Sequence, residues 1–412
     1  MTESNANNPS RPWIMNAFVM SAPGHLAPGL WRHPDQGDLT VDHWVKLAKL
    51  LEEARFHGVF FADVLGIYDV YKGPSNNTPA LQSAAQIPIG DPSLLISAMA
   101  HATKSLSFGV TASTTYENPA AKSYGLDEQV PHDERYARAD EFMQVVYKLL
   151  EGSWQEGAVV KDKKTGVYVN PDAVKRIDHK GSGQKFAATH SEAMFLPGLI
   201  PEKTRKIVDD TKALLIQQGR KPDSVRFLTG IFIVVDETDE KAQAKFQDLL
   251  QYADLEGTAA LFGGWSGTDL ANFSDDEDFA FTGPGAIQSM VKAWTATVPG
   301  TEGLKWTKPR VLEQLAISGA HAKAIGGPKT VADILQRWIT EAGIDGFNLS
   351  YATTPGTFED MIKYLWPELR ARGVLQEDYP VPGGSMRETF LADAQGPRVR
   401  ADHPAATYTW KQ

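Results

Sequence analysis

The order of apolar and amphipathic segments in this sequence predicts an α/β fold, namely a TIM-type (β/α)8 barrel with insertions. Short apolar runs alternate with longer helical patterns, which is typical of βαβ units around a parallel sheet. Polar residues follow the apolar runs at Asp63, Thr111 and Asn348, and in such barrels the functional groups lie at the carboxyl ends of the strands. The chain of 412 residues is long enough for one barrel domain with insertions.

Three strands and two helices are expected in the first part of the chain. The strands are Trp13–Met20, Val59–Ala62 and Leu106–Thr111, and the helices are Val41–Phe56 and Pro92–Ala102. Within the first helix apolar residues recur three or four positions apart, so they form one inner face.

A further helix is expected to begin at Asp133. Pro131 disfavours helical backbone in the residue before it, and Asp133 is a good N-cap residue. His132 and Tyr136 then lie about one turn apart, at a helix start whose free N–H groups and dipole favour a phosphate. The pattern predicts a phosphate site formed by these two side chains. A capped surface helix without a ligand is the alternative.

Three strands and four helices follow in the second part of the chain. The strands are Glu192–Phe195, Val225–Val235 and Gly346–Tyr351, and the helices are Pro201–Gln218, Lys241–Tyr252, Thr330–Ala342 and Phe358–Arg372. The stretch Gly257–Gly285 is rich in Gly and Asp, which predicts an inserted loop. We expect one domain over residues 1–412, with an insertion around 254–325 and a C-terminal extension over 375–412.

The six expected strands are two fewer than a closed eight-stranded barrel requires. The shortfall is confined to two places. Between Thr115 and Asp133 there is no room for a helix and a strand, because one β/α unit takes about 30 residues. The run from Asp178 to Gln184 likewise leads directly into Lys185 without a strand.

The composition excludes several classes of function. The net charge of −10 and the lack of a Lys/Arg cluster argue against a nucleic-acid or anionic-membrane partner. The sequence has no cysteine, and its ten histidines show no metal-binding spacing, so we expect no metal site. No segment has the length and apolarity of a signal peptide or membrane span, which predicts a cytoplasmic protein.

Four separate motifs resemble the flavin-dependent monooxygenases of the bacterial-luciferase superfamily. Within it they are similar to the branch of the nitrilotriacetate (component A), dibenzothiophene-sulfone and dimethyl-sulfide monooxygenases. The motifs are Trp31–Pro34, Phe61–Gly66, Gly109–Glu117 and His132–Tyr136. The resemblance extends over nearly the whole chain and implies a luciferase-like barrel.

The resemblance also implies a flavin site at the carboxyl ends of the strands. Its residues would be Asp63, Thr111 and Ser113 near the flavin ring, His132 and Tyr136 at the ribityl or phosphate group, and Ser182 near the phosphate. Asp63 as a simple turn cap and Thr111 as an ordinary strand residue are the alternatives.

Side chains after the first strand are candidates for acid–base chemistry. His25 and His33 would overhang the barrel mouth, where an imidazole can move a proton, although isolated loop histidines are more often incidental. Phe18, Phe262 and Trp265 are candidates for an apolar pocket over the flavin, although aromatic residues in such positions are more often simple packing.

The family scheme implies a two-component enzyme. A separate NADH:FMN oxidoreductase would supply reduced FMN by diffusion, which agrees with the absence of a G-x-G-x-x-G motif from the sequence. The enzyme would insert one oxygen atom from O2 into a small substrate, a sulfide by preference, with C–S cleavage. The alternatives are an aminopolycarboxylate or an aromatic sulfone as substrate, or a flavin-binding protein without turnover. A flavin-independent barrel enzyme is disfavoured, and the resemblance implies a homodimer or homotetramer.

Two segments found in the resembled family are missing from this sequence. Family members carry an Arg-rich helix and a fourth strand before the Gly125 region, and a fifth strand before Lys185. A barrel that simply lost two strands would expose edges and core. We therefore expect that the polypeptide contains residues which the sequence omits, and a true double deletion is the alternative.

Overall fold

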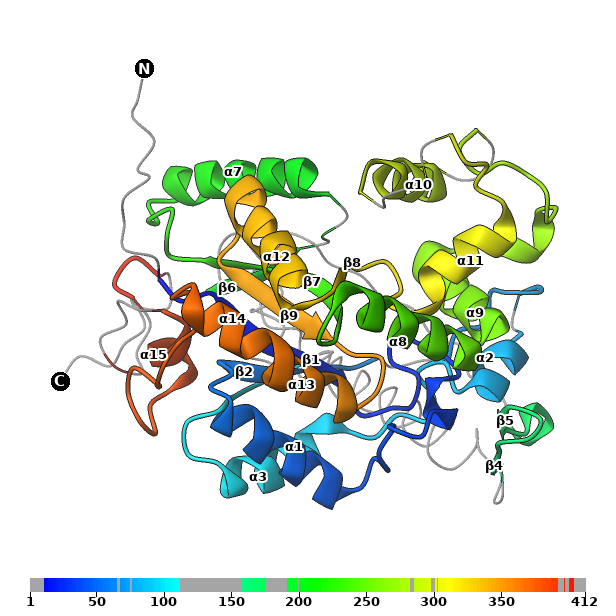
Figure 1. Ribbon diagram of the computed structural model, residues 1–412, viewed down its shortest axis with the longest axis horizontal. Helices are drawn as coiled ribbons and strands as arrows, with labels where there is room; N and C mark the ends of the chain where they lie inside the picture. The colour runs from blue at the N-terminus through cyan, green and yellow to red at the C-terminus, as the bar shows by residue number, and fades with distance from the viewer. Residues whose placement is uncertain are drawn as a thin grey trace, which may run out of the picture.

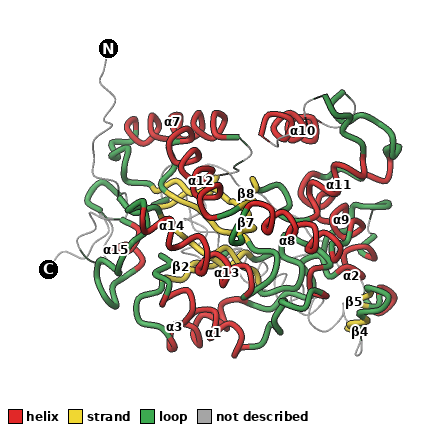
Figure 2. The backbone as a smooth tube through the Cα atoms, viewed as in Figure 1, coloured by secondary structure: helices red, strands yellow, loops and turns green. Residues whose placement is uncertain are grey.

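The protein is described by a computed structural model that defines residues 11–64, 67–74, 76–111, 158–174, 191–196, 198, 200–281, 285–297, 301, 303–391, 396 and 400–403. A parallel β-sheet lies at the centre, and helices surround it (Figure 1, Figure 2). The predicted helix from Asp133 lies outside the described residues, as do the candidate site residues Ser113, His132, Tyr136 and Ser182.

Seven strands form the parallel sheet in the described part of the chain. They are β1 (Ile14–Met20), β2 (Gly58–Ala62), β3 (Ser107–Val110), β6 (Ala193–Leu196), β7 (Arg226–Val235), β8 (Ala322–Gly326) and β9 (Gly346–Ser350). Their order is β3-β2-β1-β9-β7-β6, and β8 pairs with the second half of β7. The sheet curls into half of a barrel, so the predicted barrel class is confirmed.

All six expected strands are present, and no end differs from its expected position by more than one residue. The strand β7 is buried along its whole length, as its run of apolar and β-branched residues predicts. These six strands form the continuous path of the sheet, and a seventh strand, β8, lies off this path beside β7. It was not expected, because Ala322, Lys323 and Ala324 are poor strand formers, and pairing with β7 fixes their conformation.

The expected helices pack against the outer face of the sheet. They are α1 (Val41–Glu53), α3 (Pro92–Ala102), α7 (Pro201–Gln217), α8 (Asp239–Tyr252) and α12 (Pro328–Ala342), with a closing helix that runs from α13 (Gly356–Asp360) through a π-helical turn (Met361–Leu365) into α14 (Trp366–Ala371). The main core lies between these helices and the sheet. It includes Trp44, Phe61, Phe227 and Phe347, which are completely buried.

The expected loop at Gly257–Gly285 is wrong over its first part, which forms α9 (Leu255–Ser266). The side chain of Asp254 caps this helix by accepting from the N–H of Gly257 at 2.8 Å. Gly264 lies where the Tyr68 ring passes, because a side-chain carbon there would come within 1.8 Å of Tyr68 Cδ1. These glycines therefore serve close packing rather than loop formation.

The insertion forms a second apolar cluster beside the barrel. The helices α9, α10 (Gly285–Thr297) and α11 (Lys308–Ala316) pack there with α2 (Thr78–Ser83), and Leu261, Trp294 and Trp306 lie in the cluster. A hairpin of β4 (Val159–Asp162) and β5 (Val167–Val169) lies close to α2 (Figure 1). The remaining short elements are η1 (Leu30–Arg32), η2 (Pro171–Ala173), η3 (Leu270–Asn272) and α15 (Met386–Phe390).

The edges of the sheet lie beside the two places where strands are expected to be missing. In the described part of the chain β3 and β6 each have one neighbouring strand. A fourth strand would follow β3 in sequence, and a fifth would precede β6. Phe195 of β6 is 40% exposed although its ring packs on Phe60.

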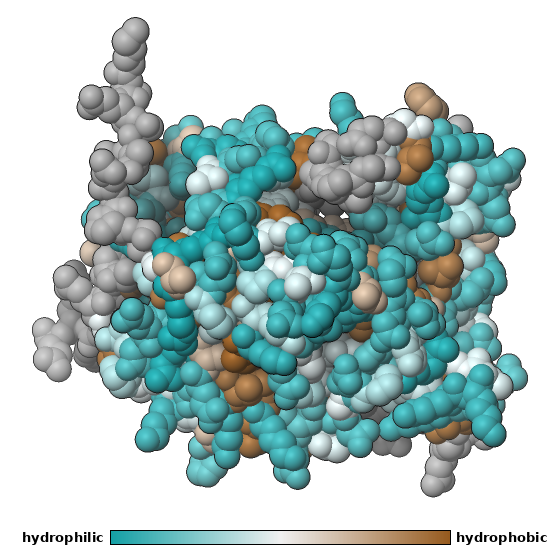
Figure 3. Space-filling view, in the orientation of Figure 1, coloured by the Kyte–Doolittle hydropathy of each residue, from teal (hydrophilic) through white to brown (hydrophobic). Residues whose placement is uncertain are grey.

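The outer surface is mostly hydrophilic on the face shown in Figure 3. None of the helices in the described residues is both long enough and apolar enough to cross a membrane.

Candidate active site at the carboxyl ends of the strands

Aromatic side chains line the inner face of the half-barrel. Successive residues of a strand point to opposite sides, so Phe18 of β1 and Phe60 of β2 point inward while their neighbours pack against the helices. The two rings stack with centroids 5.8 Å apart, and Phe60 contacts Phe195 of β6 at 4.5 Å. Below them Asn16 donates a buried hydrogen bond to Asn348 at 2.8 Å. The wall is therefore apolar and supported by a polar pair.

Two histidines lie at the mouth of this aromatic wall. The ring of His25 packs on Phe18 at 4.8 Å and on Tyr351 at 5.5 Å, and the ring of His321 packs on Phe18 at 5.7 Å. His321 Nδ1 is 2.8 Å from the hydroxyl of Ser350. His25 is 2% exposed, and its Nδ1 has no hydrogen-bond partner among the described residues.

Burial keeps both imidazoles neutral at physiological pH. Desolvation, together with a smaller contribution from the neighbouring His321, lowers the pKa of His25 to about 3. Desolvation lowers the pKa of His321 to about 4. A neutral imidazole has one donor and one acceptor nitrogen, so His25 can accept or donate one proton at a reacting group.

A buried glutamine holds the loop that carries His25. The amide nitrogen of Gln86 donates to the main-chain oxygen of His25 at 2.5 Å, and the hydroxyl of Tyr68 donates to the side-chain oxygen of Gln86 at 2.8 Å. Burial raises the pKa of Tyr68, so this hydroxyl stays protonated.

Asp63 and Thr111 lie at the ends of adjacent strands, as the sequence predicts. Val110 pairs with Phe61 in the parallel register, and both the N–H and the hydroxyl of Thr111 donate to the Phe61 oxygen, at 3.0 and 3.3 Å. The lone pairs of that hydroxyl remain available to accept. Partial burial raises the pKa of Asp63, and the nearby Asp91 adds to the effect.

The second predicted histidine, His33, lies in a different cavity of about 380 Å³ that His25 does not line. Both of its ring nitrogens have partners: Nε2 is 3.2 Å from Asp248, and Nδ1 accepts from the N–H of Asp35 at 3.1 Å. These contacts fit a structural role, and its acid–base role stays a prediction.

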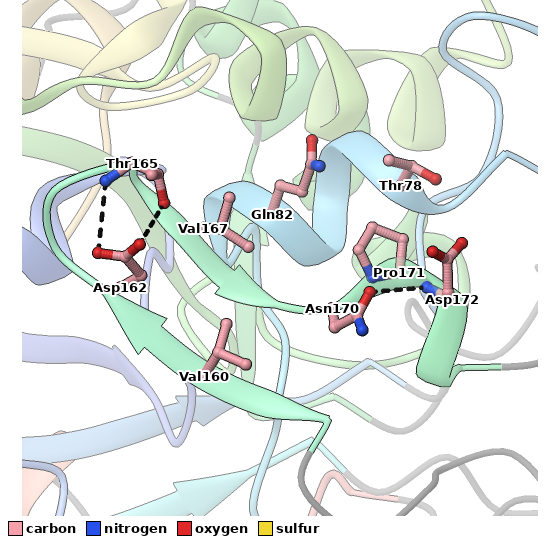
Figure 4. A pocket seen from close by; sticks show the side chains of 9 residues that line it. All are labelled: Thr78, Gln82, Val160, Asp162, Thr165, Val167, Asn170, Pro171 and Asp172. Carbon is pink, nitrogen blue, oxygen red and sulfur yellow. Dashed lines mark hydrogen bonds between the residues drawn. The ribbon is translucent and has the colours of Figure 1, made fainter.

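A larger groove of about 580 Å³ runs between α2 and the β4–β5 hairpin (Figure 4). Several of its polar groups are engaged in local turns: Asp162 accepts from Thr165 at 2.8 Å, and Asn170 caps η2. The groove has no histidine or cationic side chain among its lining residues, so it offers little for catalysis.

The residues at the strand ends fit a flavin. A flat, largely apolar ring system suits the aromatic wall of Phe18 and Phe60, while Asp63 and Thr111 offer acceptors at its edge. The ring of His25, whose Nδ1 has no hydrogen-bond partner among the described residues, packs on the same Phe18. No group of three or more His, Asp or Glu within the described residues is placed to hold a metal ion.

Four residues of this site were not assigned from sequence: Tyr68, Gln86, His321 and Ser350. Tyr68 lies two residues after the motif Phe61–Gly66, so its position carried a signal. Gln86 and His321 lie in loops without a recognisable spacing, and only the folded chain brings them to His25.

Comparison with known proteins shows the family of the chain. Residues 121–346 match the family described as luciferase-like monooxygenase. The dimethyl-sulfide monooxygenase of Hyphomicrobium sulfonivorans is 37% identical, over 96% of this chain and 93% of that protein. The chain belongs to the luciferase-like monooxygenases. It is therefore a flavin-dependent monooxygenase, of a family that uses reduced FMN.

Two further comparisons support the family and the fold. The long-chain alkane monooxygenase of Geobacillus thermodenitrificans is 35% identical, over 96% of this chain and 97% of that protein. The crystal structure of DmoA from H. sulfonivorans superposes with a TM-score of 0.76 at 36% identity, covering 97% of this chain and 96% of that one. The alignment to the dimethyl-sulfide enzyme spans 455 positions, which is more than the 412 residues of this chain. The dimethyl-sulfide enzyme therefore has segments without a counterpart in this sequence.

Proposed function

We propose that this protein is the oxygenase of a two-component system and oxidises a small uncharged sulfide with cleavage of a C–S bond. The observation that carries the proposal is the pair of neutral histidines on an aromatic wall, beside strand ends that suit a flavin. The similarity to a dimethyl-sulfide monooxygenase supports the sulfide. A separate NADH:FMN oxidoreductase supplies the reduced FMN, and the chain works as a homodimer or homotetramer.

The described residues of the site include no cationic side chain, which favours an uncharged substrate over an anionic one. Phe18, Phe60 and the two neutral imidazoles offer no fixed cation to a polycarboxylate, and burying an unpaired carboxylate is costly. Lys323 on the neighbouring β8 donates instead to the Gln314 carbonyl, in the last turn of α11, and burial lowers its pKa to about 7. An aminopolycarboxylate is thus disfavoured relative to a sulfide, a sulfone or an alkane.

The described residues would bind the substrate and move one proton. Bound reduced FMN supplies two electrons, with which O2 places one oxygen atom on the carbon beside sulfur and releases the other as water. The hydroxylated carbon then leaves as an aldehyde and the sulfur as a thiol, which requires a proton to pass from the hydroxyl to the sulfur. The free Nδ1 of His25 is suited to that transfer. The aromatic wall excludes water.

The binding of the cofactor would be divided between two groups of residues. Asp63, Thr111 and Ser113 would hold the edge of the ring, while His132, Tyr136 and Ser182 would hold the ribityl and phosphate groups. Phosphate binding at the predicted helix from Asp133 would use free N–H groups of its first turn.

One assay tests this function. The protein is supplied with FMN, NADH and a generic flavin reductase, and oxygen use and products are followed with dialkyl sulfides, a sulfone, a long-chain alkane and nitrilotriacetate. We expect thiol and aldehyde in equal amounts from a dialkyl sulfide. Tight FMN binding with no product from any compound would favour a silent flavin-binding protein. Product from nitrilotriacetate alone would refute the uncharged substrate.

A further inference from the structure

A chain of three hydrogen bonds connects the insertion to the loop that carries His25. The indole Nε1 of Trp265, at the end of α9, donates to the hydroxyl of Tyr68 at 2.9 Å. Tyr68 then donates to Gln86 at 2.8 Å, and Gln86 donates to the His25 main-chain oxygen at 2.5 Å. The chain therefore begins in the insertion and ends at the barrel mouth.

The donor at one end and the acceptor at the other fix the direction of every bond in this chain. An indole N–H donates only, so the Tyr68 oxygen must accept from Trp265 and its proton is directed to Gln86. The main-chain oxygen of His25 accepts only, so the amide nitrogen of Gln86 is turned toward it and the side-chain oxygen of Gln86 faces Tyr68. Without the indole N–H, the Tyr68 hydroxyl would lose its donor, and Tyr68 and Gln86 would be free to shift together.

The ring of Trp265 also packs against the segment that leads to His321. A side-chain carbon at Gly319 would lie 2.8 Å from Cη2 of the indole and 3.5 Å from Leu26. The N–H of Ser318 donates to the Leu26 oxygen at 3.1 Å. The segments that carry His25 and His321 are thus joined to each other beneath this ring.

We propose that Trp265 is a positioning residue that sets the orientation of His25 against His321 through Tyr68 and Gln86. The inference rests on the proposed function of this site, in which His25 moves a proton. Trp265 is 41% exposed, so it is not a residue of the buried core. The insertion thereby takes part in catalysis as well as in packing.

The variant Trp265→Phe tests this role, because it keeps an aromatic ring and removes the N–H. We expect product per oxygen consumed to fall about tenfold, as misplacement of a reacting group predicts, while KM for the sulfide and Kd for reduced FMN stay within about twofold. Trp306→Phe is the matched control. It also loses an indole bond, to Thr295 at 2.9 Å, in the apolar cluster of the insertion but outside the chain of hydrogen bonds.

Two further measurements separate positioning from general stability. If Trp265 acts through Tyr68, the effects of Trp265→Phe and Tyr68→Phe are not additive in the double variant. The NMR signal of 13Cε1-labelled His25, assigned with His25→Gln, should shift in Trp265→Phe and stay in place in Trp306→Phe. Additive losses, an unmoved His25 signal or equal behaviour of the two tryptophan variants would overturn the proposal. If the wild type makes no product, the proposed function fails, and the His25 signal still decides the role of Trp265.

Discussion

Acid should destabilise this protein through its buried neutral histidines, and His57 allows the effect to be measured. His57 is 4% exposed, and its Nδ1 accepts from the N–H of Met15 at 3.2 Å. Desolvation lowers its pKa from 6.5 to about 3. Below pH 6.5 the unfolded chain therefore binds a proton at His57 that the folded chain does not bind. The free energy of unfolding is thus highest above pH 6.5, and it decreases as the pH falls toward 3.

The size of the loss follows from the width of this pH window. One pH unit corresponds to about 1.4 kcal/mol, so His57 lowers the free energy of unfolding by about 2 kcal/mol between pH 6.5 and pH 5. His25, with the same direction and a similar pKa, should contribute about as much. The total of roughly 4 kcal/mol is a large part of the 5–15 kcal/mol typical of native proteins.

The variant His57→Asn isolates the contribution of this ring. Its side-chain oxygen can still accept from Met15, so the loss at pH 7 should be limited to about 1–2 kcal/mol for the lost volume. Urea unfolding followed by circular dichroism at pH 7 and pH 5 should show a pH-dependent loss that is about 2 kcal/mol smaller than in the wild type. His101→Asn, at an exposed position of α3, is the control and should leave that loss unchanged. A loss in His57→Asn equal to that of the wild type would refute the neutral, buried state of His57.

Three other changes test separate features. Glu52 accepts from the N–H groups of Lys104, Ser105 and Leu106, so Glu52→Ala should lower the free energy of unfolding by about 1–3 kcal/mol, and a change below about 0.5 kcal/mol in urea unfolding would contradict this. Gly29 has φ of +87°, and a side-chain carbon there would lie 2.4 Å from the Tyr252 oxygen; Gly29→Ala should therefore lower Tm more than Gly219→Ala, where φ is +75° and nothing lies within 4 Å. Equal shifts would show that the contact is unimportant. Finally, mass spectrometry of the intact protein should give a mass above 45.1 kDa if segments are omitted from the sequence, and a value near 45.1 kDa would refute the omission.

Periodic burial explains which parts of the fold could be predicted. The helix α12 and the strand β7 carry strong apolar patterns, and both occur where those patterns predict them. The strand β8 and the helix α9 were missed for the opposite reason. Many of their residues are alanine or glycine, and their conformations are fixed by neighbours such as β7 and Tyr68 rather than by local preference.

The site divides in the same way between local and long-range signals. Asp63 and Thr111 could be placed at strand ends because each directly follows a recognisable strand. His321 and Gln86 could not, because their relation to His25 depends on contacts between loops that are distant in sequence. A motif reports which residues are present, whereas the contact of His25 and His321 with the same Phe18 ring depends on the fold.

Within the described residues the sheet has no strand between β3 and β6, which bears on the expectation that segments are omitted from the sequence. The inward ring of Phe195 on the edge strand β6 is 40% exposed, and exposed edges carrying large apolar side chains favour aggregation. Two more strands between β3 and β6 would cover that ring, pair both edges and complete the wall that begins with Phe18 and Phe60. The same two strands would bring further side chains to the mouth that His25 and His321 share. The segments that close the barrel would therefore also complete the pocket, so the range of substrates should depend on them as much as on the residues described.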